Sequence, residues 1–201
     1  MLGNHDYYYS SLCDVDREVA SLHDEIENVF WMDRASVQQI SDRGDVLLGI
    51  GGWGDARAGS FMDTPIRIND HRLIEELSNV SRAVLQERLE ARGRAMADLL
   101  RTKLLDCVDA KCIWVLTHVP PFAEACWYRG QAGNPNWPPD FACVSVGEAL
   151  EEFAEKNPSK QIRVLCGHGH NRGIIQKAPN LMIYTAAAEY QKPTVEAYWS
   201  L

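Results

Sequence analysis

CIWVLTH, residues 112–118, is the stretch that decides the fold. Its continuous apolar run predicts a strand that is buried on both faces of a sheet. A second run of the same kind, IRVLC at 162–166, leads directly into Gly-His-Gly-His at 167–170. The sequence therefore predicts two buried core strands, each of which runs directly into histidine.

Helical and extended patterns alternate around these two strands. Apolar residues at helical spacing predict helices over 14–30, 72–105 and 146–156, the second bent or divided near Gly93. Short apolar runs predict further strands over 45–50, 173–176, 181–186 and 194–201. The proline-rich residues 119–143 predict a long loop. We therefore predict one α/β domain (α+β layered) over residues 1–201, with helices on both faces of its sheet.

The amino-acid composition of the chain argues against nucleic-acid and membrane partners. The chain has 20 Lys and Arg against 28 Asp and Glu, a formal charge of −8, and no dense basic run, which argues against docking of nucleic acid. It has neither a signal-peptide pattern nor the run of about 18 apolar residues that a membrane helix needs. We expect a cytoplasmic protein without a membrane partner, with its six cysteines reduced.

Three histidines follow the two predicted core strands: His118 after the first, and His168 and His170 after the second. Ligands gather at the carboxyl ends of strands in layered α/β sheets, and neutral imidazole is the commonest metal ligand in proteins. We predict that these side chains converge on one site. The alternative is that a histidine at a strand end only caps backbone groups.

The segment Gly-Asn-His-Asp at 3–6 offers complementary chemistry. The carbonyl oxygen of Asn4 is a hard ligand for a divalent cation. His5 can act as an acid beside such a cation, and Asp6 can hold the orientation of its ring. Taken alone, this tetrapeptide is also an ordinary turn.

Taken together, GNHD at 3–6, LTHVPPF at 116–122 and CGHGH at 166–170 resemble the calcineurin-like metallophosphoesterase family in order and rough separation. The resemblance covers nearly the whole chain. It implies a β-sandwich flanked by helices, and hydrolysis of a phosphate mono- or diester by a dimetal-activated hydroxide. The implied substrate is a phosphate-ester small molecule or a phosphoprotein.

The resemblance also implies roles for individual residues. Two divalent ions (Mn, Fe or Zn) are expected, of which the first is bound by Asn4, His118 and His168 and the second by His170. His5 is implied as the catalytic histidine, with Asp6 beside it.

The family pattern begins upstream with an Asp-x-His step and a Gly-Asp step, which have no counterpart before Gly3. We therefore expect a partial domain that lacks N-terminal βα units and, alone, binds metal poorly and hydrolyses little. An exposed sheet edge near Met1, beside 112–117 or 162–166, would invite self-association. The candidate substitutes, by residue type only, are Asp42, Asp45, Asp55 and Asp63. The alternative function is a non-catalytic remnant that serves as a binding module.

Two further stretches bear on the site. The loop that follows His118 carries Trp127, Tyr128, Arg129 and Trp137, which we predict to bind the substrate; packing of the loop by its own aromatic side chains is the alternative. GIGGWG at 49–54 fits a dinucleotide-binding pattern, but no helix pattern follows it, so we interpret it as a loop close to the sheet.

We expect His71, on a polar helical stretch, to lie at the surface.

Overall fold

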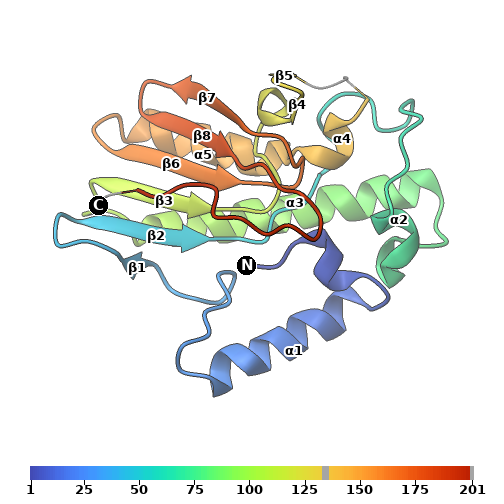
Figure 1. Cartoon of the computed structure of the whole chain (residues 1–201), viewed down its shortest axis with the longest axis horizontal. Helices are drawn as coiled ribbons and strands as arrows, with labels where there is room; N and C mark the ends of the chain where they lie inside the picture. Colours follow the sequence, from blue (N-terminus) through green and yellow to red (C-terminus); the bar gives the residue numbers. More distant parts are fainter. Residues whose placement is uncertain (133–135, 200–201) are drawn as a thin grey trace.

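The computed structural model describes residues 1–132 and 136–199, and its centre is a six-stranded mixed sheet (Figure 1). The strand order is β1-β2-β3-β6-β8-β7. The strands are β1 (Gln38–Gln39), β2 (Asp45–Gly49), β3 (Cys112–Leu116), β6 (Gln161–Cys166), β7 (Gly173–Ala178) and β8 (Leu181–Thr185). The four central strands are parallel, and β1 and β7 pair antiparallel at the two edges. A separate two-stranded ribbon consists of β4 (Trp127–Tyr128) and β5 (Gln131–Ala132).

The helices are α1 (Leu12–Glu25), α2 (Asp70–Leu73), α3 (Arg82–Leu105), α4 (Pro138–Phe141) and α5 (Val144–Lys156). Single 3-10 turns are η1 (Asn4–Tyr7), η2 (Glu75–Leu77) and η3 (Ala123–Ala125). The stretch predicted as one bent or divided helix is divided before Ser81 and not at Gly93. Ser81 caps α3, its hydroxyl accepting from the backbone N–H of Val84, whereas Gly93 lies inside α3.

The main core lies between the sheet and the helices α3 and α5, which cover one face (Figure 1). Alternate residues of β6 and β8 point toward these helices, as strand geometry requires, and Val164 and Ile183 among them are fully buried. Burying a side chain of this size stabilises the fold by about 1.5–3 kcal/mol. The prediction of an α/β layered sheet is therefore confirmed.

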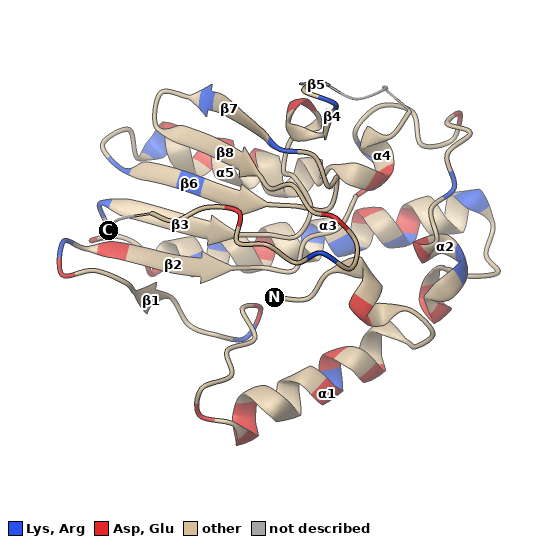
Figure 2. Cartoon of the chain, viewed as in Figure 1, with Lys and Arg blue, Asp and Glu red and all other residues tan. Residues whose placement is uncertain are grey.

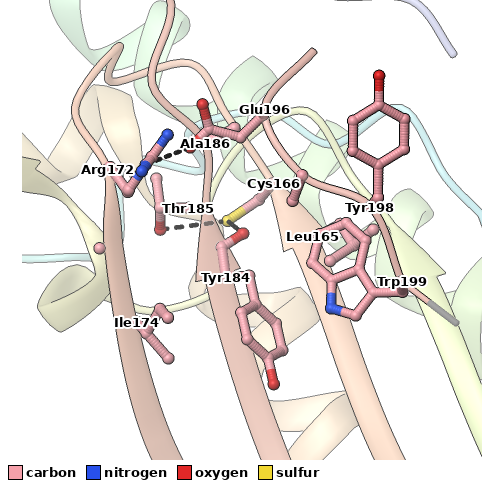
Figure 3. A pocket seen from close by; sticks show the side chains of 12 residues that line it. Leu165, Cys166, Arg172, Ile174, Tyr184, Thr185, Ala186, Glu196, Tyr198 and Trp199 are labelled. Atoms are coloured by element: carbon pink, nitrogen blue, oxygen red, sulfur yellow. Dashed lines mark hydrogen bonds and ion pairs between the residues drawn. The ribbon is translucent and has the colours of Figure 1, made fainter.

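The C-terminal tail, residues 186–199, lies across the opposite face of the sheet (Figure 1). Trp199 packs against Trp114 and Tyr184, with ring centroids 5.4 Å and 6.0 Å apart, and Glu196 pairs with Arg172 at 2.6 Å (Figure 3). A groove of about 430 Å³ is bordered by Arg172, Tyr184, Glu196 and Trp199. Figure 2 shows that charged residues are concentrated on helices and loops, so the strands under the tail are mostly uncharged.

Three expectations about the sheet are wrong. Residues 194–199 pair with no strand, because the tail crosses the sheet instead of running beside a strand; Ser200 and Leu201 lie outside the described residues. In the part of the chain that the structure describes, helices cover one face of the sheet, and the tail lies across the other (Figure 1). The expected open edge beside β3 or β6 does not exist, because β3 lies between β2 and β6, and β6 lies between β3 and β8.

The sandwich implied by the family resemblance is also not seen in residues 1–132 and 136–199, which form one large sheet and a two-stranded ribbon. None of the helices in this described part of the chain combines the length and apolar character needed to cross a bilayer.

Candidate functional site

The candidate site lies at the carboxyl edge of the parallel strands. β3 and β6 are parallel neighbours, so the loops that carry His118 and His168 leave the sheet side by side. Backbone hydrogen bonds fix these loops: His118 N–H donates to Gly51 O at 2.7 Å, and Gly167 N–H donates to His118 O at 2.9 Å. The register of two buried strands therefore sets the positions of both histidines.

The loop after β6 has an unusual backbone. His168 and His170 adopt left-handed conformations, with φ of 63° and 56°, on either side of Gly169. Left-handed backbone is uncommon for residues other than glycine and is costly. These turns direct both imidazoles into the same region above the sheet, where both line one hollow.

Three polar atoms meet at this edge. His118 Nε2 lies 2.9 Å from Asn4 Oδ1 and 3.1 Å from His168 Nδ1. The turn that carries Asn4 approaches closely because Gly3 has no side chain: a Cβ there would lie 2.8 Å from His118 Cε1. The structure thus brings together Asn4, His118 and His168, a set of residues separated widely in the sequence.

The protonation of this cluster decides what it can bind. Burial, followed by the neighbouring His168, lowers the pKa of His118 to about 3, although Asp70 acts in the opposite sense. Burial lowers the pKa of His168 to about 4. Both rings are therefore neutral at pH 7, and one hydrogen at most lies on His118 Nε2. A single N–H cannot serve both neighbours at full strength, whereas a cation can be shared by three lone pairs.

A hollow of about 270 Å³ opens beside the cluster. It is lined by Asn4, His5, Tyr8, Arg67, Ile68, Asn69, Asp70, Trp137, Phe141, His168, His170 and Tyr190. The ring of His5 stacks on Tyr8 at 4.6 Å and on Tyr190 at 5.8 Å, and His170 contacts Tyr190 at 4.8 Å. Burial and the nearby His5 lower the pKa of His170. His5 and His170 therefore share the hollow without joining the three-atom contact.

Sequence reasoning missed Asp70 as a member of this site. Asp70 begins α2 and is only 3% exposed; its Oδ1 accepts hydrogen bonds from Asn4 Nδ2 at 2.8 Å and from Tyr8 Oη at 2.7 Å. It is 66 residues from Asn4, and no local pattern links the two. The carboxylates considered as substitutes do not line the hollow: Asp42, Asp45, Asp55 and Asp63.

The role predicted for Asp6 is not supported by its contacts. Asp6 Oδ2 accepts from the backbone N–H of Gly3 at 2.7 Å, which closes the turn η1. In the described residues, the ring of His5 contacts Tyr8 and Tyr190 instead of the Asp6 carboxylate. The short turn directs Asp6 back to the chain start, so the orientation of His5 depends on tyrosines.

Of the four loop residues predicted to bind substrate, Trp137 lines the hollow, whereas Trp127, Tyr128 and Arg129 do not. Trp127 packs so tightly on Gly173 that a Cβ there would lie 1.9 Å from the indole nitrogen. Tyr128 is 52% exposed, and the guanidinium of Arg129 lies over its ring. The alternative prediction, a loop packed by its own aromatic side chains, does not describe Trp127 and Tyr128 either, because Trp127 packs on Gly173 outside the loop and Tyr128 is exposed; residues 133–135 lie outside the described residues.

His71 is not at the surface as expected. Its side chain is 6% exposed, and its Nε2 lies 3.1 Å from Asp140 Oδ1 in α4. This contact links α2, which carries Asp70, to α4, which carries Phe141 against the ring of His168 at 4.4 Å. His71 therefore belongs to the support of the hollow.

Acid should destabilise the metal-free protein through the cluster. The pKa of His168 falls from 6.5 to about 4 on folding, so the unfolded chain binds more protons between these pH values and stability falls as pH falls. The free energy of unfolding should decrease by an amount on the order of 3 kcal/mol between pH 6.5 and 4 from this group. Urea denaturation at several pH values measures it. His168→Gln should flatten the dependence and His23→Gln should not; equal slopes in all three proteins would contradict the prediction.

Residues 1–132 and 136–199 contain no group of three or more His, Cys, Asp or Glu side chains placed to hold a metal ion; the cluster consists of two imidazoles and one amide oxygen. Comparison of the chain with protein-family models finds no match, and comparison with curated proteins finds none either.

Proposed function

We propose that this protein is a metal-dependent phosphoesterase whose site is built on Asn4, His118 and His168. The observation that carries the proposal is the contact of His118 Nε2 with both Asn4 Oδ1 and His168 Nδ1, at 2.9 Å and 3.1 Å. The motifs that resemble calcineurin-like metallophosphoesterases contribute these same three residues. Both lines of support therefore point to one place in the fold.

The three atoms fit a divalent cation of the first transition row. Two neutral imidazoles and an amide oxygen form a mixed donor set that suits Mn, Fe or Zn. Donor atoms that hold one cation at about 2.1 Å in octahedral positions lie about 3 Å apart, which agrees with both contacts. The cation that the resemblance assigns to His170 remains a prediction, because His170 is in contact with Tyr190 and outside the three-atom cluster.

The chain's own residues supply the rest of the chemistry. A bound divalent cation contributes positive charge that stabilises the developing negative charge of phosphoryl transfer. His5, exposed and stacked on Tyr8, faces the hollow and can donate a proton to the leaving oxygen. Arg67 lies in the same lining, and its guanidinium can pair with a phosphate oxygen.

The hollow also favours a substrate with an aromatic group. Beyond the polar cluster, its lining includes Trp137, Phe141 and Tyr190, and the residues Trp137 and Tyr190 are 41% and 65% exposed. Accessible aromatic faces bind planar groups by stacking. Aryl phosphate esters are therefore suitable first substrates.

The test combines metal binding with turnover. The purified chain, stripped with a chelator, is titrated with Mn²⁺, Zn²⁺ or Fe²⁺ up to millimolar concentration, and bound metal is counted by elemental analysis after dialysis. Hydrolysis of p-nitrophenyl phosphate and bis-p-nitrophenyl phosphate is followed in parallel. In keeping with the weak binding and low activity expected from the sequence, we expect one ion per chain only at the higher metal concentrations, and slow turnover that stops on adding chelator. Absence of both would favour the alternative function, a non-catalytic binding module.

A further inference from the structure

We propose that Asp70 is a positioning residue that fixes the side-chain amide of Asn4, so that its oxygen faces His118. Asp70 is outside the motifs that suggested the function, and it reaches the site from α2, a separate element. The proposal rests on the proposed function in one respect, namely that Asn4 Oδ1 is a cation ligand. The amide orientation itself can be measured without any cation.

The argument begins with the hydrogen-bonding capacity of a carboxylate. An ionised carboxylate has no hydrogen to donate, so a side-chain amide beside it must present its NH₂ group. Asn4 Nδ2 lies 2.8 Å from Asp70 Oδ1. The amide has one oxygen, and with the nitrogen held by Asp70 that oxygen lies 2.9 Å from His118 Nε2. Rotation of the amide by 180° would place its oxygen against the carboxylate and its NH₂ against the imidazole.

Tyr8 strengthens this arrangement. Its hydroxyl donates to Asp70 Oδ1 at 2.7 Å and accepts from Asn4 Nδ2 at 3.3 Å. Burial, followed by the hydrogen bond to Asp70, raises the pKa of Tyr8, so the phenol remains a donor at all working pH values. Asp70 thus receives two hydrogens on one oxygen, and a second contact holds the amide nitrogen of Asn4.

Burial leaves the side chains of Asn4 and Asp70 few alternative hydrogen-bond partners. Asn4 and Asp70 are 7% and 3% exposed, so water has little access to either group. A buried donor that loses its partner therefore has no ready replacement. Removing the Asp70 carboxylate should free the amide of Asn4 to turn, and with it the oxygen that faces the cluster.

The first experiment measures the amide without metal. Two-dimensional ¹⁵N NMR of the full chain records the side-chain NH₂ pair of Asn4, assigned by its disappearance in Asn4→Ala. We expect slow hydrogen exchange in the wild type and exchange faster by about tenfold or more in Asp70→Ala. Asp70→Asn retains an acceptor oxygen and should keep the exchange slow. Glu75→Ala removes an exposed carboxylate nearby and should change nothing.

The second experiment measures Mn²⁺ affinity by electron paramagnetic resonance. Loss of an outer partner of a ligand typically costs about 10–100-fold in metal affinity, so Asp70→Ala should weaken binding by that factor. Asp70→Asn should recover most of the affinity if the hydrogen bond matters, and little of it if only the charge matters. The second result would overturn the positioning role.

The remaining outcomes distinguish failure of the positioning role from failure of the proposed function. Unchanged Asn4 exchange in a folded Asp70→Ala protein would overturn the inference whatever the metal does. Faster exchange in a protein that binds no Mn²⁺ even as the wild type would support the positioning role and overturn the proposed function. If Asp70→Ala does not fold, Tyr8→Phe is the substitute: it removes one of the two contacts to the Asn4 amide and should shift its NMR signals, and identical signals would count against the proposal.

Discussion

Replacement of His118 by alanine is expected to weaken Mn²⁺ binding by about 100-fold or more and to abolish hydrolysis of aryl phosphates. His118 Nε2 is the one atom that contacts both other members of the cluster. Its loss leaves an amide oxygen and a single imidazole, too few donors to hold a divalent cation against water. Equilibrium dialysis with Mn²⁺ and a p-nitrophenyl phosphate assay measure the two effects.

His170→Ala is the matched control for this prediction. It removes an imidazole from the same hollow but not from the three-atom contact, so the affinity for the Mn²⁺ ion at that contact should fall much less than in His118→Ala. Circular dichroism checks that both variants are folded. Equal losses in the two variants would place the cation nearer to His170, and wild-type affinity in His118→Ala would contradict the proposed site.

Replacement of Lys103 by methionine is expected to destabilise the fold by an amount on the order of 3 kcal/mol. Lys103 is 7% exposed, and its ammonium donates to three backbone carbonyls, those of Met32, Ala35 and Gly49. Methionine has a comparable volume but leaves these buried carbonyls without a donor. Gly49 ends β2, two residues before the Gly51 carbonyl that fixes His118, so the site should loosen as well.

Guanidinium denaturation measures this effect. The control is Lys156→Met, because Lys156 lies on the exposed side of α5 and its ion pair with Glu152 is solvent-exposed. Such pairs contribute about 0–1 kcal/mol, so this variant should resemble the wild type. A Lys103→Met protein as stable as the wild type would show that the three carbonyls find other partners.

The sequence predicts those parts of the fold that local patterns encode. The apolar run at 112–117 forms β3 at Cys112–Leu116, and the run at 162–166 forms β6 at Gln161–Cys166. Parallel pairing of these two strands then places His118 beside His168 without further information. Gly3 permits the close approach of Asn4 to the His118 ring, but the tertiary structure decides which ring the turn meets.

Contacts between distant segments are not encoded locally. Asp70 reaches Asn4 because the 56–77 region packs against η1 in a second core around Tyr7 and Ile74, and no spacing in the sequence reports this. The loop residues Trp127 and Tyr128 are aromatic, as residues that line a substrate-binding site often are. Packing of Trp127 on Gly173 directs them elsewhere, and only the tertiary structure contains that information.

The left-handed backbone at His168 and His170 places two imidazoles in the hollow at a cost in folding stability. Each such residue costs about 1–2 kcal/mol relative to relaxed backbone, and glycine would remove most of that cost. Selection for heat resistance alone would therefore favour glycine at position 170, at the expense of an imidazole in the hollow. Engineering this protein for robustness should leave that loop untouched and take its gains from the remote helices.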